Sequence, residues 1–382
     1  MKIRTITCGV NVGHADWASV IRRASQFLQR SRACLEREGY EVQSVRMSTQ
    51  TWPGCRSGYG RARVVAQIKK WEQTAADHGI TFTSIGTVRD PRSIHLIPGI
   101  IAGTVSVSAS ATIAGRRYGI DYGSVQAAAQ AIVRISRTTA GGYGNFRFAA
   151  IANCPSDVPF YPAGYHEGPP CFSVGLECGD LIGRAFRGAR SLPEAGRRLS
   201  RILIAEFGAV ERICRRLSRD ANFAFRGVDV SIAPSLVKRE SLALAYEKLG
   251  LGRFGSAGTL AISALITDAL RSVPIMTCGY RGLMLPILED WGLARRFSSG
   301  HADIASFLAF SAVCGTGLDC VPLPGATSVK KIYALLLDVA ALAVKLDKPL
   351  SARLLPVPGK TVGEKTDFKS PYLIDTKIRD IS

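Results

Sequence analysis

The sequence lacks the features that mark secreted and membrane-spanning proteins. Its first residues, Met1 to Thr7, carry charge where a secretory leader needs an unbroken apolar core, so they predict a first strand. The most apolar later stretch, Ile332 to Leu346, is interrupted by Asp338 and Lys345 and is shorter than the ~20 residues that span a bilayer. We therefore expect a cytoplasmic protein without membrane contact.

Metal-binding and disulfide patterns are also missing. The ten cysteines contain no CxxC pair and no spacing of a metal motif, which favours free thiols in a reducing compartment, mostly as small core residues. The five histidines form no HxxH or HxH pair, so catalytic zinc has little support from the pattern.

Nucleotide and nucleic-acid motifs are absent as well. No Walker or GxGxxG segment stands between a strand and a helix, and nothing indicates haem or PLP. The net charge of +19 and pI near 9.8 favour contact with phosphates, as in RNA binding. Yet the arginines are spread over helix faces, as at Arg197–Arg201 and Arg215–Arg216, without the aromatic residues of an RNA-binding motif. A compositional bias of the source genome explains them better, and nucleic acid is an unfavoured partner.

The elements that are present alternate between strand and helix. Of the 382 residues, 47% are hydrophobic and 21% charged, which is ordinary for a globular protein. The periodicity predicts βαβ units and a largely parallel sheet. No linker marks a domain boundary, so we expect one α/β domain over residues 1–360 and an irregular tail over 361–382. The expected strands include 3–10, 41–47, 81–86 and 146–153, and the expected helices 17–38, 61–78, 124–136, 191–219, 239–248, 258–270 and 328–345.

Four short apolar segments each carry an acid and are followed by a turn and a helix. They are Cys171–Glu177, Gly227–Pro234, Leu285–Asp290 and Gly317–Gly325. Because side chains alternate across a strand, Asp229 and Ser231 share one face of theirs, opposite an apolar face. This pattern predicts strands around a small polar chamber, with an active site at the mouth of a barrel.

The acids of these segments have two interpretations. They could converge as a site for Mg²⁺ or Ca²⁺, or as an acid/base pair, because oxygen ligands suit hard cations and crowded carboxylates have separated pKa values. Alternatively, each acid caps a helix or pairs with an arginine. The candidates are Glu177, Asp229, Glu289, Asp290 and Asp319, with Asp229, Asp319 and Glu289 as the metal ligands.

A long loop rich in proline and glycine, residues 153–170, is the second candidate region. Long loops inside compact domains are often functional. His166 in this loop could act as a general acid or base, or could simply bond to the backbone. Cys154 at its start could pair with His166 as an activated thiolate, or be a buried small residue.

A third candidate is an anion site near the C-terminus. After the Pro-Gly turn ending at Gly325, Thr327 and Ser328 can cap a helix whose N–H groups, together with Lys360, suit a carboxylate or phosphate. Ordinary helix capping explains the same residues. Cys314, beside a Gly-Thr-Gly turn, is a further candidate for contact with substrate.

Several segments, in order along nearly the whole chain, resemble a domain-of-unknown-function family classed with the pyruvate formate-lyase-like α/β barrels. They are Asn153–Pro155, Pro162–His166, Phe172–Glu177, Val228–Pro234, Gly282–Asp290, Cys314–Asp319 and Pro356–Lys360. The resemblance implies a closed ten-stranded barrel made of two five-stranded halves, with a loop inserted into it. It does not imply radical chemistry, because Gly279-Tyr280 lacks the preceding residues of a glycyl radical site.

These observations favour a cytoplasmic barrel enzyme that carries out hydrolysis, elimination or isomerisation on a small anionic metabolite. In this hypothesis Asp229 and Asp319 hold a cation or move a proton, while His166 is an acid/base on the loop. A non-catalytic small-molecule sensor that engages a partner and an RNA-associated protein are the alternatives. A homodimer is expected only from the general frequency of dimers.

Overall fold

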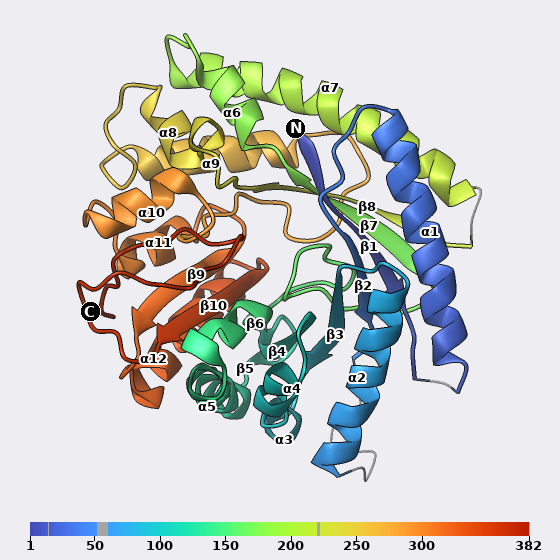
Figure 1. Cartoon of the computed structure of the whole chain (residues 1–382). Coiled ribbons are helices and arrows are strands. Elements are labelled where there is room, and N and C mark those ends of the chain that lie inside the picture. Colours follow the sequence, from blue (N-terminus) through green and yellow to red (C-terminus); the bar gives the residue numbers. More distant parts are fainter. Residues whose placement is uncertain (14, 52–59, 220–221, 382) are drawn as a thin grey trace.

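The computed structural model describes residues 1–382 except 14, 52–59, 220–221 and 382. Its centre is a ten-stranded mixed sheet in the order β8-β7-β1-β2-β3-β4-β6-β10-β9, with β5 paired to β4 (Figure 1). The strands are β1 (Lys2–Val10), β2 (Val45–Thr49), β3 (Phe82–Val88), β4 (Val107–Gly115), β5 (Gly119–Ile120), β6 (Phe148–Ala152), β7 (Cys171–Glu177), β8 (Ala224–Ala233), β9 (Gly317–Pro324) and β10 (Leu350–Val357).

The directions of the strands divide the sheet into two parts. β1, β2, β3, β4 and β6 are mutually parallel neighbours, whereas β7 runs antiparallel to β1 and β10 runs antiparallel to β6. The carboxyl ends of the first five strands therefore meet the amino ends of β7 and β10. We call this end of the strands the cavity end, and the opposite end the far end.

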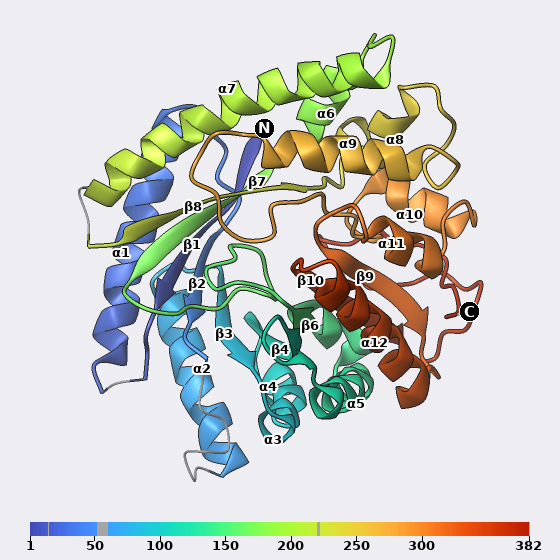
Figure 2. The ribbon, with the colours of Figure 1, turned by 180° about the vertical axis from the view of Figure 1, so that it is seen from behind.

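Helices lie on the outside of the strands (Figures 1 and 2). The longest, α7, spans Leu192–Arg219 and buries Leu199, Leu203, Phe207 and Val210, which recur at helical spacing and pack on α6, α9 and β8. The helices are α1 (Trp17–Arg37), α2 (Arg61–Asp77), α3 (Pro91–Ile94), α4 (Ile97–Gly103), α5 (Tyr122–Thr138), α6 (Gly179–Phe186), α7, α8 (Leu242–Glu247), α9 (Thr259–Arg271), α10 (Trp291–Ser298), α11 (Ile304–Phe310) and α12 (Val329–Lys345). None of the described helices has the length and apolarity of a membrane span.

The segment of residues 276–287 connects the two edge strands of the sheet. On one side, Val228 of β8 donates its backbone N–H to the carbonyl of Met276 at 2.9 Å. On the other side, the N–H of Ile287 donates to the carbonyl of Asp319 in β9 at 3.0 Å. The segment thus bridges β8 and β9 without being a regular strand.

One expected strand is not formed. Leu285–Asp290 is extended and then turns, and its prediction as a strand was wrong. Pro286 has no N–H to donate to a ladder, and Asp290 is already the N-cap of α10. The other three acid-bearing segments form β7, β8 and β9, and in β8 the expected alternation holds, with Val228 and Val230 in the apolar core and Asp229 buried on the other face.

The loop of residues 153–170 enters the space between the strands (Figure 1). Val158 and Tyr165 are buried, and the Ser84 hydroxyl of β3 donates to the Gly164 carbonyl at 2.6 Å. Phe160 lies directly over Gly175 of β7, where a Cβ atom would collide with its ring. These contacts fix the loop, and with it His166, at the cavity end.

The chain after β10 contains no helix or strand among its described residues. It returns to α10, where the Thr376 hydroxyl donates to the Ala294 carbonyl at 2.7 Å and the Arg379 guanidinium donates to the carbonyl of Ser298 at 2.8 Å. The segment is irregular in backbone but docked on the domain.

Candidate functional site

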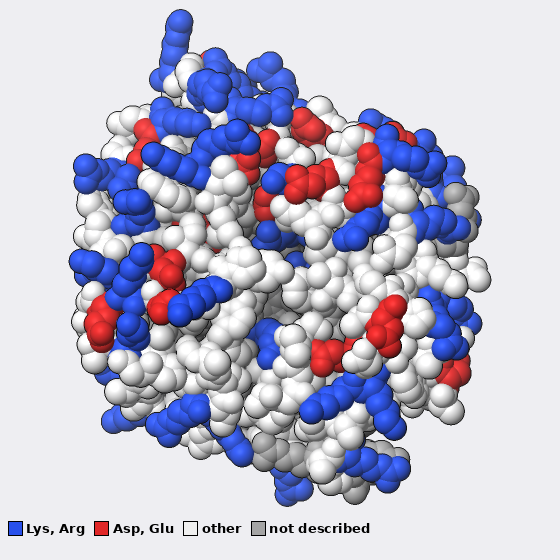
Figure 3. All heavy atoms as spheres, in the orientation of Figure 1, with Lys and Arg blue, Asp and Glu red and all other residues white. Residues whose placement is uncertain are grey.

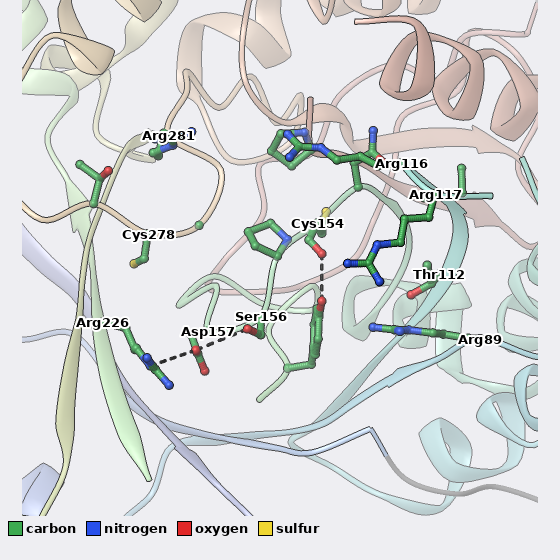
Figure 4. A pocket seen from close by; sticks show the side chains of 18 of the residues that line it. Arg89, Thr112, Arg116, Arg117, Cys154, Ser156, Asp157, Arg226, Cys278 and Arg281 are labelled. Carbon is green, nitrogen blue, oxygen red and sulfur yellow. Dashed lines mark hydrogen bonds and ion pairs between the residues drawn. The ribbon is translucent and has the colours of Figure 1, made fainter. Parts of the chain in front are cut away.

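A cavity of about 700 Å³ opens at the cavity end, and arginine dominates its wall. Figure 4 shows Arg89, Arg116 and Arg117 on one side and Arg226 and Arg281 on the other, with Cys154 and Ser156 between the two groups. The arginines come from the end of β3, the β4–β5 turn, β8 and the bridging segment. Residues distant in sequence therefore place their cations around one space.

The positive charge of this wall is only partly neutralised. Arg116 pairs with Asp347, and Arg89 lies 3.3 Å from a Glu167 carboxylate oxygen. Arg117 and Arg281 have no carboxylate partner among the residues that the structure describes. The cavity therefore offers guanidinium groups to an anionic ligand, for which their planar fork is suited.

Asp157 lines the cavity, and it contacts His166 and Cys171, which lie behind the cavity wall. The Asp157 Oδ1 atom lies 3.0 Å from His166 Nδ1 and 3.2 Å from Cys171 Sγ, and Arg226 Nε is 3.5 Å from the other oxygen. His166 is completely buried, with its backbone N–H bonded to the Thr49 carbonyl of β2 at 3.0 Å. The group thus belongs partly to the loop and partly to β7.

The hydrogen bonds of the ring fix which nitrogen faces Asp157. His166 Nε2 lies 3.0 Å from the carbonyl of Gly168, which can only accept, so this nitrogen carries a hydrogen. In a neutral ring the Nδ1 lone pair would then face the Asp157 carboxylate, which is repulsive. The contact therefore needs a hydrogen or a metal ion between the two atoms.

Cys154 and Cys171, two of the cysteines at this end, are thiols rather than thiolates. Burial, reinforced by the Asp157 charge, raises the pKa of Cys171 to about 12. Burial likewise raises the pKa of Cys154 to about 12, and its Sγ atom donates to the Leu350 carbonyl at 3.4 Å. No hydrogen bond joins Cys154 to His166, and the cysteine beside the ring is Cys171.

Three of the five expected acids, Glu177, Glu289 and Asp319, gather toward the far end beside arginines. Arg353 Nε lies 2.6 Å from Asp319 Oδ1 and its Nη2 lies 2.5 Å from Glu289 Oε1. Arg4 Nη1 is 2.9 Å from Glu177 and its Nη2 is 3.5 Å from Glu289. The carboxylates of Glu289 and Asp319 thus lie together with the guanidinium group of Arg353 between them, and their role as a metal site or acid/base pair stays a prediction.

Asp229 does not join that group. It is fully buried in β8, and its carboxylate accepts the Ser231 hydroxyl at 2.6 Å and the backbone N–H groups of Tyr280 at 2.9 Å and Arg281 at 3.1 Å. Ser231 in turn accepts the N–H of Gly282. The pair holds the backbone of the bridging segment, and so the position of Arg281. A cation held by Asp229, Asp319 and Glu289 stays a prediction.

Asp290 also has structural partners. It caps α10 by accepting the N–H of Gly292 and of Leu293, both at 2.9 Å, and accepts the Ser241 hydroxyl at 2.7 Å. This is the helix-capping interpretation of the sequence.

The residues of the expected anion site lie elsewhere. Ser328 caps α12 by accepting the Lys331 N–H at 3.2 Å, and Thr327 donates to the Pro324 carbonyl at 2.7 Å. The Lys360 carbonyl accepts the N–H of Gly325 at 3.0 Å, which joins the two Pro-Gly turns. Cys314 is buried beside Lys348, which donates to its carbonyl. None of these four predicted residues lines the arginine cavity, and their contact with substrate stays a prediction.

The sequence interpretation missed most of the cavity. It assigned the arginines to a compositional bias of the source genome. Figure 3 agrees that basic side chains are spread over the visible face. Five arginines nevertheless line the cavity. Asp157 and Cys171 were missed because neither stands in a recognised spacing with His166. Arg116-Arg117 in a tight turn directly after a strand was the one available signal.

Comparison with known proteins places the chain in a family. The family described as "Uncharacterised ACR (DUF711)" matches residues 1–370. The chain belongs to the DUF711 family. The family resemblance of the sequence is thereby confirmed, and it assigns no reaction.

Relatives of this DUF711 chain occur in several organisms. A UPF0210 protein of Pyrobaculum aerophilum is 30% identical over 405 residues, covering 97% of this chain and 88% of the relative. One of Methanococcoides burtonii is 28% identical, covering 96% and 87%. Among solved structures, the anaerobic ribonucleotide reductase of Thermotoga maritima in complex with dATP and CTP matches with a TM-score of 0.45 and 8% identity, over 98% of this chain and 79% of that one.

Proposed function

We propose that this DUF711 protein binds a small polyanionic metabolite in the arginine cavity and acts on it by proton transfer without redox chemistry. The observation that carries the proposal is the pair Arg117 and Arg281, which face the same cavity with no carboxylate partner among the described residues. Two arginines without carboxylate partners repel each other, and a bound dianion would offset this repulsion.

The frame for this site is a closed barrel, in which the bridging segment of residues 276–287 takes the place of a strand between β8 and β9. Hydrogen bonds on both of its sides support closure. A closed sheet has no free edge and leaves one mouth at each end. The cavity would then be the mouth at which the loop of residues 153–170 enters.

The group placed to move a proton is Asp157, which is the only carboxylate among the described residues that line the cavity. His166 would be a positioning residue, since its ring contacts Asp157 rather than the cavity. Covalent catalysis by Cys154 is less favoured, because the raised pKa of this thiol leaves little thiolate at neutral pH. Elimination and isomerisation both need such a base beside a carboxylate or phosphate anchor.

A thermal-shift screen tests the binding step. The probes are dicarboxylates, phosphate monoesters and neutral polyols of similar size. We expect the melting temperature to rise with the dianions and not with the polyols, because only the dianions meet the guanidinium groups. The rise should disappear in Arg117→Gln/Arg281→Gln and persist in Arg22→Gln/Arg23→Gln, which changes two exposed arginines of α1.

The catalytic step needs a separate test with the anion that the screen selects. We expect product formation, followed by mass spectrometry, to be lost in Asp157→Asn, because an amide cannot accept a proton. A tightly bound anion that is never converted would instead support the sensor hypothesis. No dianion effect at all would refute the proposal.

A further inference from the structure

The structure points to a transition-metal site at the cavity end: we propose that Asp157, His166 and Cys171 bind one Zn²⁺ ion in tetrahedral geometry. Zinc would take the Oδ1 atom of Asp157, the residue that the proposed function uses as its base, so the two assignments share this carboxylate. The zinc inference does not rest on the binding or conversion of an anion. It begins from three different ligand atoms, an oxygen, a nitrogen and a sulfur, that lie within 4.8 Å of one another.

The spacing of these atoms fits the ion. In a tetrahedral site with Zn–N and Zn–O near 2.0 Å and Zn–S near 2.3 Å, the ligand atoms lie about 3.3 to 3.6 Å apart. Here Asp157 Oδ1 to His166 Nδ1 is 3.0 Å, Asp157 Oδ1 to Cys171 Sγ is 3.2 Å, and Cys171 Sγ to His166 Nδ1 is 3.5 Å. Outward shifts of a few tenths of an ångström would admit the ion.

The second ring nitrogen is arranged as in metal-binding histidines. Such a histidine commonly donates its other N–H to a carboxylate or a backbone carbonyl, which fixes the tautomer. His166 Nε2 does so with Gly168, and its Nδ1 is therefore directed at Asp157 and Cys171. A zinc ion between Nδ1 and the carboxylate would take the place of the hydrogen that this contact otherwise needs.

The ring is held in this orientation by close packing. A Cβ atom on Gly9 of β1 would collide with Nδ1 of His166 and approach Cys171 Sγ to 3.0 Å. The ring cannot swing toward β1, so two of the three ligands are fixed before any ion binds. Preorganisation of this kind raises metal affinity because little ordering is left for the binding step.

Charge balance favours the ion as well. On binding, the proton of the Cys171 thiol and any proton on Nδ1 would be released to solvent, and the thiolate and the Asp157 carboxylate would be two negative ligands of a divalent cation. Sulfur and imidazole ligands select zinc over Mg²⁺ or Ca²⁺. Three protein ligands leave the fourth position for water or a ligand, beside the wall that Asp157 shares with the cavity.

A second mixed group, Glu289, Asp319 and Cys320, satisfies the same distance test but differs in its neighbours. Arg353 donates to both carboxylates and Arg4 contacts Glu289, so the negative charge there is already balanced. A divalent ion would have to displace an arginine that is 8% exposed. We therefore do not assign a metal ion to Glu289, Asp319 and Cys320.

Metal analysis of the purified full-length protein tests the inference. After growth with added zinc and extensive dialysis, we expect about one equivalent of zinc per chain. Cys171→Ala and Asp157→Ala should each lose it, because two ligands do not hold the ion. Cys214→Ala, which removes an equally buried thiol from α7, should keep it.

Cobalt supplies a readout that does not depend on the folding of a variant. Adding Co²⁺ to zinc-free wild-type protein should give a thiolate-to-cobalt charge-transfer band and the strong visible bands of a tetrahedral ion. Absence of both zinc and these bands would overturn the inference, as would bands that persist unchanged in Cys171→Ala. Bound zinc without a response to dianions would support the metal site and refute the proposed function. A response to dianions without bound zinc would support the proposed function and overturn the metal site.

Discussion

At the far end, Glu289 and Asp319 enclose Arg353, whereas at the cavity end Asp157 is the only carboxylate among the described lining residues, in a wall that carries five arginines. Both regions combine carboxylates, a cysteine and guanidinium groups. The far end is buried and saturated with ion pairs, so its charges hold the fold together. The positive charge of the cavity end is only partly neutralised, so it contributes to stability only when an anion binds.

Removing Arg353 should have the largest effect on stability. Arg353→Met leaves Glu289 and Asp319 as adjacent buried carboxylates without their cation, which should cost about 3 to 5 kcal/mol in the free energy of unfolding. Urea denaturation measures it. The matched change at the cavity end, Arg117→Met, should alter that free energy by under about 0.5 kcal/mol. Equal losses would remove the contrast between the ends.

The acid dependence of stability comes next in size. Burial acts to raise the pKa of Glu289, but Arg353 and Arg4 outweigh it, so the pKa lies below its ordinary value of 4.5. A carboxyl with a lowered folded pKa stabilises the fold above its unfolded pKa and loses that contribution as the pH falls through the folded value. Glu289→Gln should lose about 2 kcal/mol at neutral pH.

Below pH 4.5 the same variant should approach the wild type, because protonation removes the wild-type advantage. Urea denaturation at a series of pH values between neutrality and pH about 3 measures this convergence. A constant difference between variant and wild type at every pH would show that Glu289 does not stabilise the fold through its charge.

Packing around the proposed zinc ligands gives an effect of similar or smaller size. Gly9→Ala should cost about 1 to 3 kcal/mol, because the new methyl group collides with the His166 ring. Gly196→Ala in α7, where the added atom meets Leu265 at 3.4 Å, should be neutral or stabilising. Thermal unfolding of both variants would compare them, and a tolerated Gly9→Ala would mean that the ring is not fixed.

Among the changes that break an ion pair, the smallest effect should come from a pair of the same chemistry on the surface. Arg116 and Asp347 are each 64% exposed at the rim of the cavity, whereas Arg353 and Asp319 are 8% and 15% exposed. Arg116→Gln should therefore change stability by less than about 1 kcal/mol, as measured by urea denaturation. A loss as large as that of Arg353→Met would contradict the view that burial decides the strength of these pairs.

The sequence predicted the framework better than the site. Apolar periodicity located α7 and β8 closely, because helix and strand periods are local properties. Leu285–Asp290 was misassigned as a strand, because its apolar residues match a strand pattern although Pro286 has no N–H to donate to a ladder. The acids Glu289 and Asp319 lie close together, but their pairing with Arg353 was not predicted, because it depends on strand neighbours that are set by tertiary topology.

The cavity could not be predicted for the same reason. Arg89, Arg226 and Arg281 lie far apart in the chain and meet only because the cavity end collects the ends of separate elements. His166 was identified, but its partners were not, because no known ligand spacing joins it to Asp157 or Cys171. What local patterns cannot supply is the direction of each side chain in the folded loop.

Isothermal titration calorimetry of the best dianion from the thermal-shift screen tests the central claim most directly. The account predicts one site per chain, with affinity reduced by about tenfold for each arginine removed in Arg117→Gln and Arg281→Gln. Affinity should be unchanged in Arg22→Gln/Arg23→Gln. An anion that binds the two cavity variants as tightly as the wild type would contradict the assignment of the cavity end as the functional site.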